Sequence, residues 1–270
     1  MMNGVIFTHT LRRNWRAMIY WGAGIGLMGL YVMAVLPGVD YLAEYARLLE
    51  SMPPILLQAF GAESAADLAT VEGFVSFGYF SWIMLVMATY AVLAGLNVTA
   101  NEEDRGILDV VLSQPISRWR VIVERFAAYA LLIAGIILLG HLGLMIGKLM
   151  APGMVIDMGR VFEASVNMLP STLLVLAFTV FIATVARSRA AAAAIAAVFV
   201  VASYFIDVIG NAASGSLAAN LGVVSFFSYY DPTTVMSEGL VWSSVLLVLA
   251  VTAVLTLASL WFFERRDIGL

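Results

Sequence analysis

Residues Phe126–Gly147 read FAAYALLIAGIILLGHLGLMIG and include no aspartate, glutamate, lysine or arginine. An α-helix needs about 20 mostly apolar residues to cross the hydrocarbon core of a bilayer. Because lipid offers no hydrogen-bond partner to the backbone, such a segment must pair its amides internally, as a helix does. The segment therefore predicts a transmembrane helix, and the fold depends on how many similar segments the chain contains.

Five further segments are also free of charged residues: Ala17–Val39, Gly73–Asn101, Ala164–Ala186, Ala190–Ile206 and Gly239–Phe263. Hydrophobic residues make up 62% of the 270-residue chain and charged residues 12%, whereas about a quarter of an average soluble domain is charged. We predict an all-α integral membrane protein that forms one domain over residues 1–270. Its six transmembrane helices are expected near residues 17–37, 75–98, 121–147, 166–186, 190–210 and 241–263.

The basic residues predict the orientation of these helices. Of the 14 arginine and lysine residues, three lie in the segments that follow the odd-numbered spans: Arg47, Lys148 and Arg160. The other eleven lie on the opposite side of the membrane, at Arg12, Arg13, Arg16, Arg105, Arg118, Arg120, Arg125, Arg187, Arg189, Arg265 and Arg266. Because cytoplasmic segments are enriched in arginine and lysine, both termini are predicted to be cytoplasmic. Residues 5–16, which mix apolar and basic side chains, are either an interfacial helix, which we predict, or a simple basic flank.

The composition also argues against several functions. Cysteine is absent, which excludes disulfides and cysteine-ligated metals. The net charge of −4 gives no reason to expect a nucleic-acid partner. No H-E-x-x-H pattern occurs, and His141 is the one histidine inside a predicted span, so neither zinc nor serine hydrolase chemistry is expected. We therefore expect no enzyme activity and no cofactor bound by this chain.

Glycines recur on one face of two predicted spans, at Gly22, Gly26 and Gly29 and at Gly140, Gly143 and Gly147. Small residues let membrane helices approach closely. The faces fit packing within one chain, which we favour, or a seam between two copies. Near the last span, the aromatic run Phe226–Tyr230 is expected at the outer headgroup level.

The segment Thr99–Arg120, TANEEDRGILDVVLSQPISRWR, has the densest charge in the chain and joins the second predicted span to the third. Asn101 is a favourable N-cap, and acidic residues follow it in the first turn, where the helix dipole favours them. Pro115 ends this short amphipathic helix, and Ser117 can cap the next. The helix is either an interfacial connector or a docking element for a cytoplasmic partner.

The same segment resembles the E-x-x-x-G-T-L…L-L-S-x-P-[IV]-S-R pattern of the ABC-2 type permeases, the membrane subunits of ATP-driven exporters of the type V kind. The matching residues are Glu102, Glu103, Arg105, Gly106, Leu108, Leu112, Ser113, Pro115, Ile116, Ser117 and Arg118. Residues 68–74 and 225–239 are also similar to that family, so the resemblance covers nearly the whole chain. One departure is Ile107, where the family often has threonine.

The resemblance implies a half-transporter in a bacterial or archaeal cell membrane. Two such permeases, identical or homologous, would pair in the bilayer, and each would bind a cytoplasmic subunit that holds ATP and Mg²⁺. The segment 99–118 would be the coupling helix. Its expected contacts with the ATP-binding subunit are Glu102, Glu103, Arg105, Gly106, Leu108, Pro115, Ser117 and Arg118. The substrate would be a lipophilic or amphiphilic molecule that is exported.

An alternative is an ion-coupled carrier or channel that works alone. Ionisable residues inside a membrane usually serve a function, and His141 and Asp207 are the candidates. His141 in a glycine-rich helix fits a packing or hydrogen-bonding role better than transport, and Asp207 lies near the outer end of its span. In contrast, the chain contains no G-x-x-x-x-G-K-[ST] phosphate loop, so energy from ATP must come through another subunit.

Overall fold

The computed structural model describes residues 4–35, 44, 47–53, 70–100, 117–186, 188–212 and 222–265. Within these ranges the regular structure is helical, and six helices are long and apolar enough to cross a membrane. The helices are α1 (Val5–Val35), α5 (Val71–Val75), η1 (Ser76–Ser81), α6 (Trp82–Leu96), α9 (Arg118–Met150), α10 (Met158–Val185), α11 (Arg189–Ala212), η3 (Phe227–Tyr229), α12 (Pro232–Glu238) and α13 (Trp242–Arg265). The prediction of six helices long and apolar enough to span a membrane is confirmed, and their topology stays a prediction.

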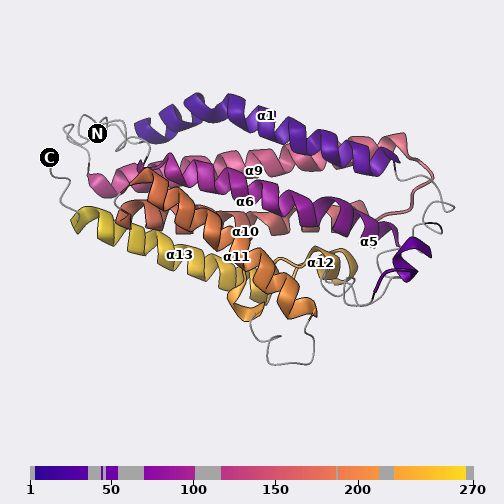
Figure 1. Ribbon diagram of the computed structural model, residues 1–270. Coiled ribbons are helices and arrows are strands. Elements are labelled where there is room, and N and C mark those ends of the chain that lie inside the picture. Colours follow the sequence, from indigo (N-terminus) through magenta and orange to yellow (C-terminus); the bar gives the residue numbers. More distant parts are fainter. Residues whose placement is uncertain are drawn as a thin grey trace.

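The long helices run side by side as an elongated bundle (Figure 1). The start of α1 and the end of α13 lie at the same end of this bundle, at the left of Figure 1. We call this the inner end, after the predicted orientation, and the opposite one the outer end. The described basic residues of the inner end include Arg12, Arg13, Arg16, Arg118, Arg120, Arg125, Arg189 and Arg265, whereas Arg47, Lys148 and Arg160 belong to the outer end.

Helices α1 and α9 pack along each other through the predicted glycine faces. A Cβ atom added to Gly143 would lie 1.9 Å from the carbonyl oxygen of Gly26, and one added to Gly147 would lie 2.8 Å from that of Leu30. Gly22 lies against the side chain of Leu139. Of the two interpretations offered for these glycines, the structure shows contact within one chain.

Two helix starts differ from the prediction. Helix α10 begins at Met158, well before the predicted start at 166, because Asp157 is its N-cap and accepts a 2.8 Å hydrogen bond from the Gly159 amide. Helix α1 is continuous from Val5 to Val35, so residues 5–16 are helical without a break before the span. Their position at the membrane surface stays a prediction.

The second span is one continuous helical segment from Val71 to Leu96 whose middle is a π-helix, η1. A π-helix contains an extra residue per turn, and such segments often occur at functional sites. Tyr79 and Phe80 of η1 are buried, and α6 continues the buried surface with Ile83, Met84 and Met87. The second span is therefore central to the core.

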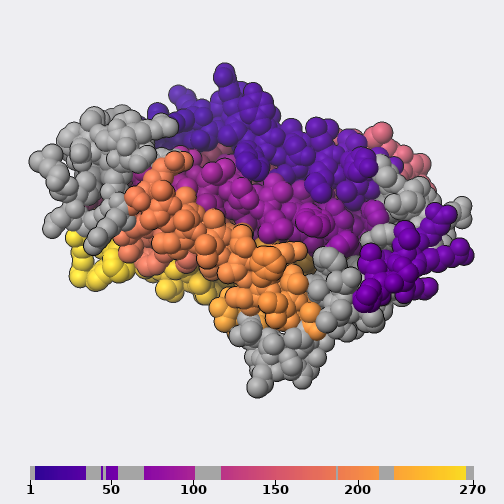
Figure 2. Space-filling view, in the orientation of Figure 1, coloured from indigo at the N-terminus to yellow at the C-terminus, as the bar shows by residue number. Residues whose placement is uncertain are grey.

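Large apolar side chains remain exposed on the outside of the bundle. Figure 2 shows α1, α6 and α11 on one face of the molecule. On α1 and α11 the exposed residues include Leu27, Tyr31, Val198, Phe205 and Ile209, and on α13 they include Leu246, Val254 and Leu257. A continuous apolar surface of this kind suits lipid rather than water.

Candidate functional site

The structure describes two of the predicted contact residues, Ser117 and Arg118. Ser117 is at the N-cap position of α9, as predicted, but its hydroxyl makes no capping hydrogen bond. Arg118 is the first residue of α9 and is half-buried. The other predicted contacts lie outside the described residues, as does the predicted coupling helix itself: Glu102, Glu103, Arg105, Gly106, Leu108 and Pro115.

Glu124 of α9 joins the start of α1 to α9. Its carboxylate accepts a 3.1 Å hydrogen bond from the Phe7 amide and a 3.4 Å one from the Gly4 amide. Helix α1 has no acidic residue in its own first turn. The first amides of a helix lack partners within it, and a negative charge there is favourable. Glu124 therefore caps α1 from another helix.

Arg125, the next residue, joins the end of α6 to α9. Its side chain is 7% exposed, and Nη1 donates a 2.6 Å hydrogen bond to the carbonyl oxygen of Val98. Val98 lies in the turn that follows α6, where carbonyl groups lack helical partners and a cation is favourable. A buried guanidinium is stable only with such partners.

Glu124 and Arg125 thus connect three helices at the inner end, and we refer to them as the Glu124–Arg125 pair. The chain passes from the turn at Val98 through residues 101–116 to the start of α9. Arg125 therefore holds the turn that enters this segment to α9, the helix that begins where the segment ends. Sequence reasoning counted Arg125 only as a basic flank and missed Glu124, although it is the only acidic residue of α9.

Three arginine–tryptophan pairs mark the inner end. The guanidinium carbon lies 4.0 Å from the ring centroid in Arg265–Trp261 and 5.5–5.6 Å from it in Arg16–Trp15 and Arg120–Trp119. The three tryptophans are 42–49% exposed. Tryptophan favours the membrane–water interface, and an arginine over its ring places the charge on the water side. These pairs are where we expect the inner interface.

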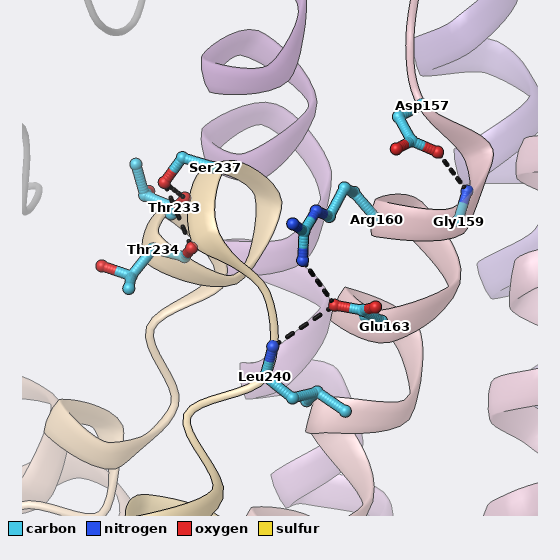
Figure 3. Close-up of polar contacts among 8 residues, drawn as sticks. All are labelled: Asp157, Gly159, Arg160, Glu163, Thr233, Thr234, Ser237 and Leu240. Carbon is cyan, nitrogen blue, oxygen red and sulfur yellow. Dashed lines mark hydrogen bonds and ion pairs between the residues drawn. The ribbon is translucent and has the colours of Figure 1, made fainter.

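At the outer end, Glu163 pairs with Arg160 inside α10 and also bonds the linker between α12 and α13 (Figure 3). Arg160 Nη1 lies 3.0 Å from Glu163 Oε2, and the same oxygen accepts a 3.3 Å hydrogen bond from the Leu240 amide. The neighbouring residue, Gly239, has φ of 101°. A Cβ there would lie 2.0 Å from Arg160 Nη1, so glycine is required by both conformation and space.

Three aromatic side chains of the run near the last span lie inside the protein, and the depth of the run at the outer headgroup level stays a prediction. Phe226, Phe227 and Tyr230 are 2%, 8% and 3% exposed. The Tyr230 hydroxyl donates a 3.2 Å hydrogen bond to the carbonyl oxygen of Phe80 in η1. Burial raises the pKa of Tyr230 well above its usual value, so the phenol remains protonated and able to donate.

A polar cavity of about 190 Å³ lies beside these rings at the outer end. Asp207 of α11 is on its wall, where Oδ1 accepts a 2.7 Å hydrogen bond from Ser228 and Oδ2 a 3.3 Å one from Asn211. Asp231 is also on the wall, and it caps α12 through the amides of Thr233 and Thr234. Asp207 lies near the C-terminal end of α11, as predicted, and that this end faces outward stays a prediction.

His141 connects α9 to α10. Its Nδ1 lies 3.1 Å from the hydroxyl of Ser165, and that hydroxyl donates a 2.8 Å hydrogen bond to the Val161 carbonyl. The serine oxygen must then accept from His141, which places a proton on Nδ1. The ring also packs edge-on against Phe162. These contacts fit the packing and hydrogen-bonding role better than a proton relay.

The fold and its apolar exterior define a multi-pass membrane protein with charged contacts at both ends. Residues 7–264 match the model of the family described as "Multidrug efflux system permease Rv1217c, C-terminal domain". The chain belongs to this family and is a transport permease. No curated protein matches the sequence. Among the described residues, no three histidine, aspartate or glutamate side chains are placed to share a metal ion.

Proposed function

We propose that this chain is the membrane-spanning subunit of an ATP-binding cassette exporter of the ABC-2 type. The observation that carries the proposal is the Glu124–Arg125 pair near the start of α9, the helix that follows residues 101–116. Its hydrogen bonds to Phe7 and Val98 hold α1 and α6 to α9 around the entry and exit of that segment. A partner that moves the segment would therefore move three helices together.

ATP hydrolysis takes place in a separate cytoplasmic subunit under this proposal. The sequence lacks a phosphate-binding loop, and its single lysine, Lys148, belongs to the outer end. The described residues of the inner end are rich in arginine, and the segment 101–116 joins two helices there. This segment is the proposed coupling helix, and Glu102, Glu103, Arg105, Gly106, Leu108, Pro115, Ser117 and Arg118 are its proposed contacts.

Two such permeases, either copies or homologues, form the transport unit in the inner membrane of a bacterial or archaeal cell. ATP draws the two cytoplasmic subunits together, and the coupling helices follow. The permease pair then shifts between inward-open and outward-open states, an equilibrium that nucleotide biases by binding one state more tightly. The exported substrate is lipophilic or amphiphilic, in keeping with membership of a multidrug efflux permease family.

Purification of the tagged full chain from its host in mild detergent tests the partner. We expect a subunit with a G-x-x-x-x-G-K-[ST] loop and ATPase activity to copurify. In that complex, Glu102→Gln and Arg118→Gln should reduce transport per ATP hydrolysed at unchanged amounts of folded protein. Glu264→Gln is the matched control, because Glu264 is exposed at the inner end on α13, outside the proposed contact.

Coupling equal to wild type in both segment variants would remove the proposed role of residues 101–116. The stand-alone carrier makes the opposite prediction about purified protein. Vesicles that contain this chain alone should then accumulate substrate when a proton or sodium gradient is imposed. We expect no such uptake, and accumulation without an ATP-binding subunit would overturn the proposal.

A further inference from the structure

We propose that the outer cavity beside η1 binds the head group of an organic ammonium ion. Its walls come from the second span, from α11 and from residues 227–233, and they include Ser81, Tyr204, Asp207, Phe227, Tyr230 and Asp231. This inference rests on the proposed transport function for its biological meaning, since it assigns a class of substrate head group. The binding step itself does not depend on ATP or on a partner.

The charge around the cavity is negative and is not neutralised by the protein. By the predicted topology the outer side carries the basic residues Arg47, Lys148 and Arg160, and the acidic residues Asp40, Glu44, Glu50, Glu63, Asp67, Glu72, Asp157, Glu163, Asp207, Asp231 and Glu238. None of the three basic residues lines the cavity. Arg160 is paired with Glu163, and Lys148 donates to the carbonyl of Met154. A cation entering from outside is therefore attracted.

Neutral groups fix the two carboxylates in place without cancelling their charge. Asp207 is half-buried and accepts from the side chains of Ser228 and Asn211. Asp231 accepts from the amides of Thr233 and Thr234, at 3.0 and 3.1 Å. Carboxylates with four acceptor sites each retain capacity for a further cation. The cavity thus keeps two negative charges in fixed positions.

Aromatic rings form the other part of the wall. Tyr204 and Phe227 meet edge to face, with centroids 5.7 Å apart and planes at 75°. Tyr230 is held by its hydrogen bond to the Phe80 carbonyl. Cations are attracted to ring faces, and quaternary ammonium groups in particular are recognised by aromatic walls. Rings combined with carboxylates favour an organic cation over a metal ion, which prefers oxygen ligands alone.

The cavity adjoins the π-helical part of the second span. Ser81, the last residue of η1, lies on its wall, and Phe80, one residue earlier, gives its carbonyl to Tyr230. A carbonyl oxygen has two lone pairs, so this one can accept from Tyr230 in addition to any bond within its own helix. A volume of about 190 Å³ is below the roughly 300–1,000 Å³ of drug-sized sites. The cavity therefore fits a compact head group, with the rest of the molecule outside.

The test is equilibrium binding of radiolabelled choline to the purified full chain in detergent. We expect saturable binding that tetramethylammonium displaces and that 3,3-dimethylbutan-1-ol, the uncharged analogue of choline, does not. Asp207→Asn preserves the shape and the hydrogen bond from Ser228 but removes the charge, and it should weaken binding about tenfold or more. Asp157→Asn is the matched control, because it removes a carboxylate charge at the outer end from a residue that does not line the cavity.

The inference is wrong if choline does not bind saturably, or if the neutral alcohol competes as well as tetramethylammonium. Equal loss in the Asp207 and Asp157 variants would also contradict it, because a diffuse surface charge would then explain the attraction. Displacement by Ca²⁺ but not by tetramethylammonium would indicate a metal site instead. The wild-type competition remains decisive even if Asp207→Asn does not fold. Loss of ATP-coupled efflux with choline binding intact would contradict the proposed function and leave this site standing.

Discussion

At the scale of single residues, the inner end depends on charges that serve backbone groups rather than each other. Glu124 accepts hydrogen bonds from two backbone amides at the start of α1. Arg125 donates a hydrogen bond to a backbone carbonyl in the turn after α6. Each side chain replaces partners that a helix end cannot supply for itself. The consequence is that α9 determines where its two neighbours begin and end.

Replacement of Arg125 by methionine should destabilise the protein. Methionine fills similar volume but leaves the Val98 carbonyl without its donor, and hydrogen bonds to charged groups contribute about 1.5–3 kcal/mol. We expect a lower melting temperature in detergent, with part of the loss restored in Arg125→Lys. Arg16→Met removes the same charge from an exposed site at the inner end and should change the melting temperature little. Equal effects of both methionine variants would refute the argument.

The α1–α9 contact gives a second prediction at this scale. In Gly143→Ala the new methyl group would overlap the Gly26 carbonyl, so the two helices must separate. Overpacking of this kind costs about 1–3 kcal/mol. Gly24→Ala is the matched control, since a Cβ at Gly24 meets nothing within 4 Å. Unfolding by denaturing detergent should occur earlier in Gly143→Ala only, and the prediction fails if Gly24→Ala unfolds as early.

These two examples show what the sequence can reveal about single residues. The glycine faces were predictable because helical spacing alone places Gly140, Gly143 and Gly147 together. The partner of Arg125 was not predictable. Every residue has a backbone carbonyl, so the sequence does not single out Val98, which lies 27 residues away. The same holds for Glu124, whose partners are amides of Gly4 and Phe7.

At the scale of elements, α12 and the linker after it connect the outer ends of several helices. Thr233 of α12 lies 2.9 Å from the hydroxyl of Ser76 in η1, and the amide of Leu240 bonds to Glu163 of α10. The long helices were predictable from length and hydropathy because the bilayer requires both. The π-turn and α12 were not, because tertiary hydrogen bonds and local caps decide such short pieces.

Gly239→Ala should loosen this connection. Alanine at φ of 101° is strained, and its Cβ would displace the guanidinium of Arg160 from Glu163. We expect a loss of about 1–3 kcal/mol, the cost of strained backbone together with a poor fit. The readout is faster proteolysis between α12 and α13. Gly153→Ala is the control in another outer linker, because its Cβ meets nothing within 4 Å. Unchanged proteolysis in Gly239→Ala would count against the connection.

At the scale of the whole molecule, the two ends differ in charge while the surface between them is apolar. Arginines gather at the inner end, three of them over tryptophan rings, and carboxylates line the outer cavity. The proposed ammonium site lies at the acidic outer end. The structure shows that the start of α1 and the end of α13 share one end of the bundle. The positive-inside rule alone predicts which side of the membrane that end faces.

Orientation can be tested directly because the chain contains no cysteine, so each introduced cysteine is the only site for a maleimide. Ser237→Cys and Gly153→Cys lie in exposed outer segments, and Glu264→Cys lies exposed at the end of α13. We expect a membrane-impermeant maleimide to label the first two in intact cells and Glu264→Cys only after permeabilisation. The opposite orientation would place the arginines near the starts of α1 and α9 outside the cell, which the positive-inside rule disfavours. The reverse labelling pattern would place residues 101–116 outside, away from any source of ATP, and the exporter proposal would then fail.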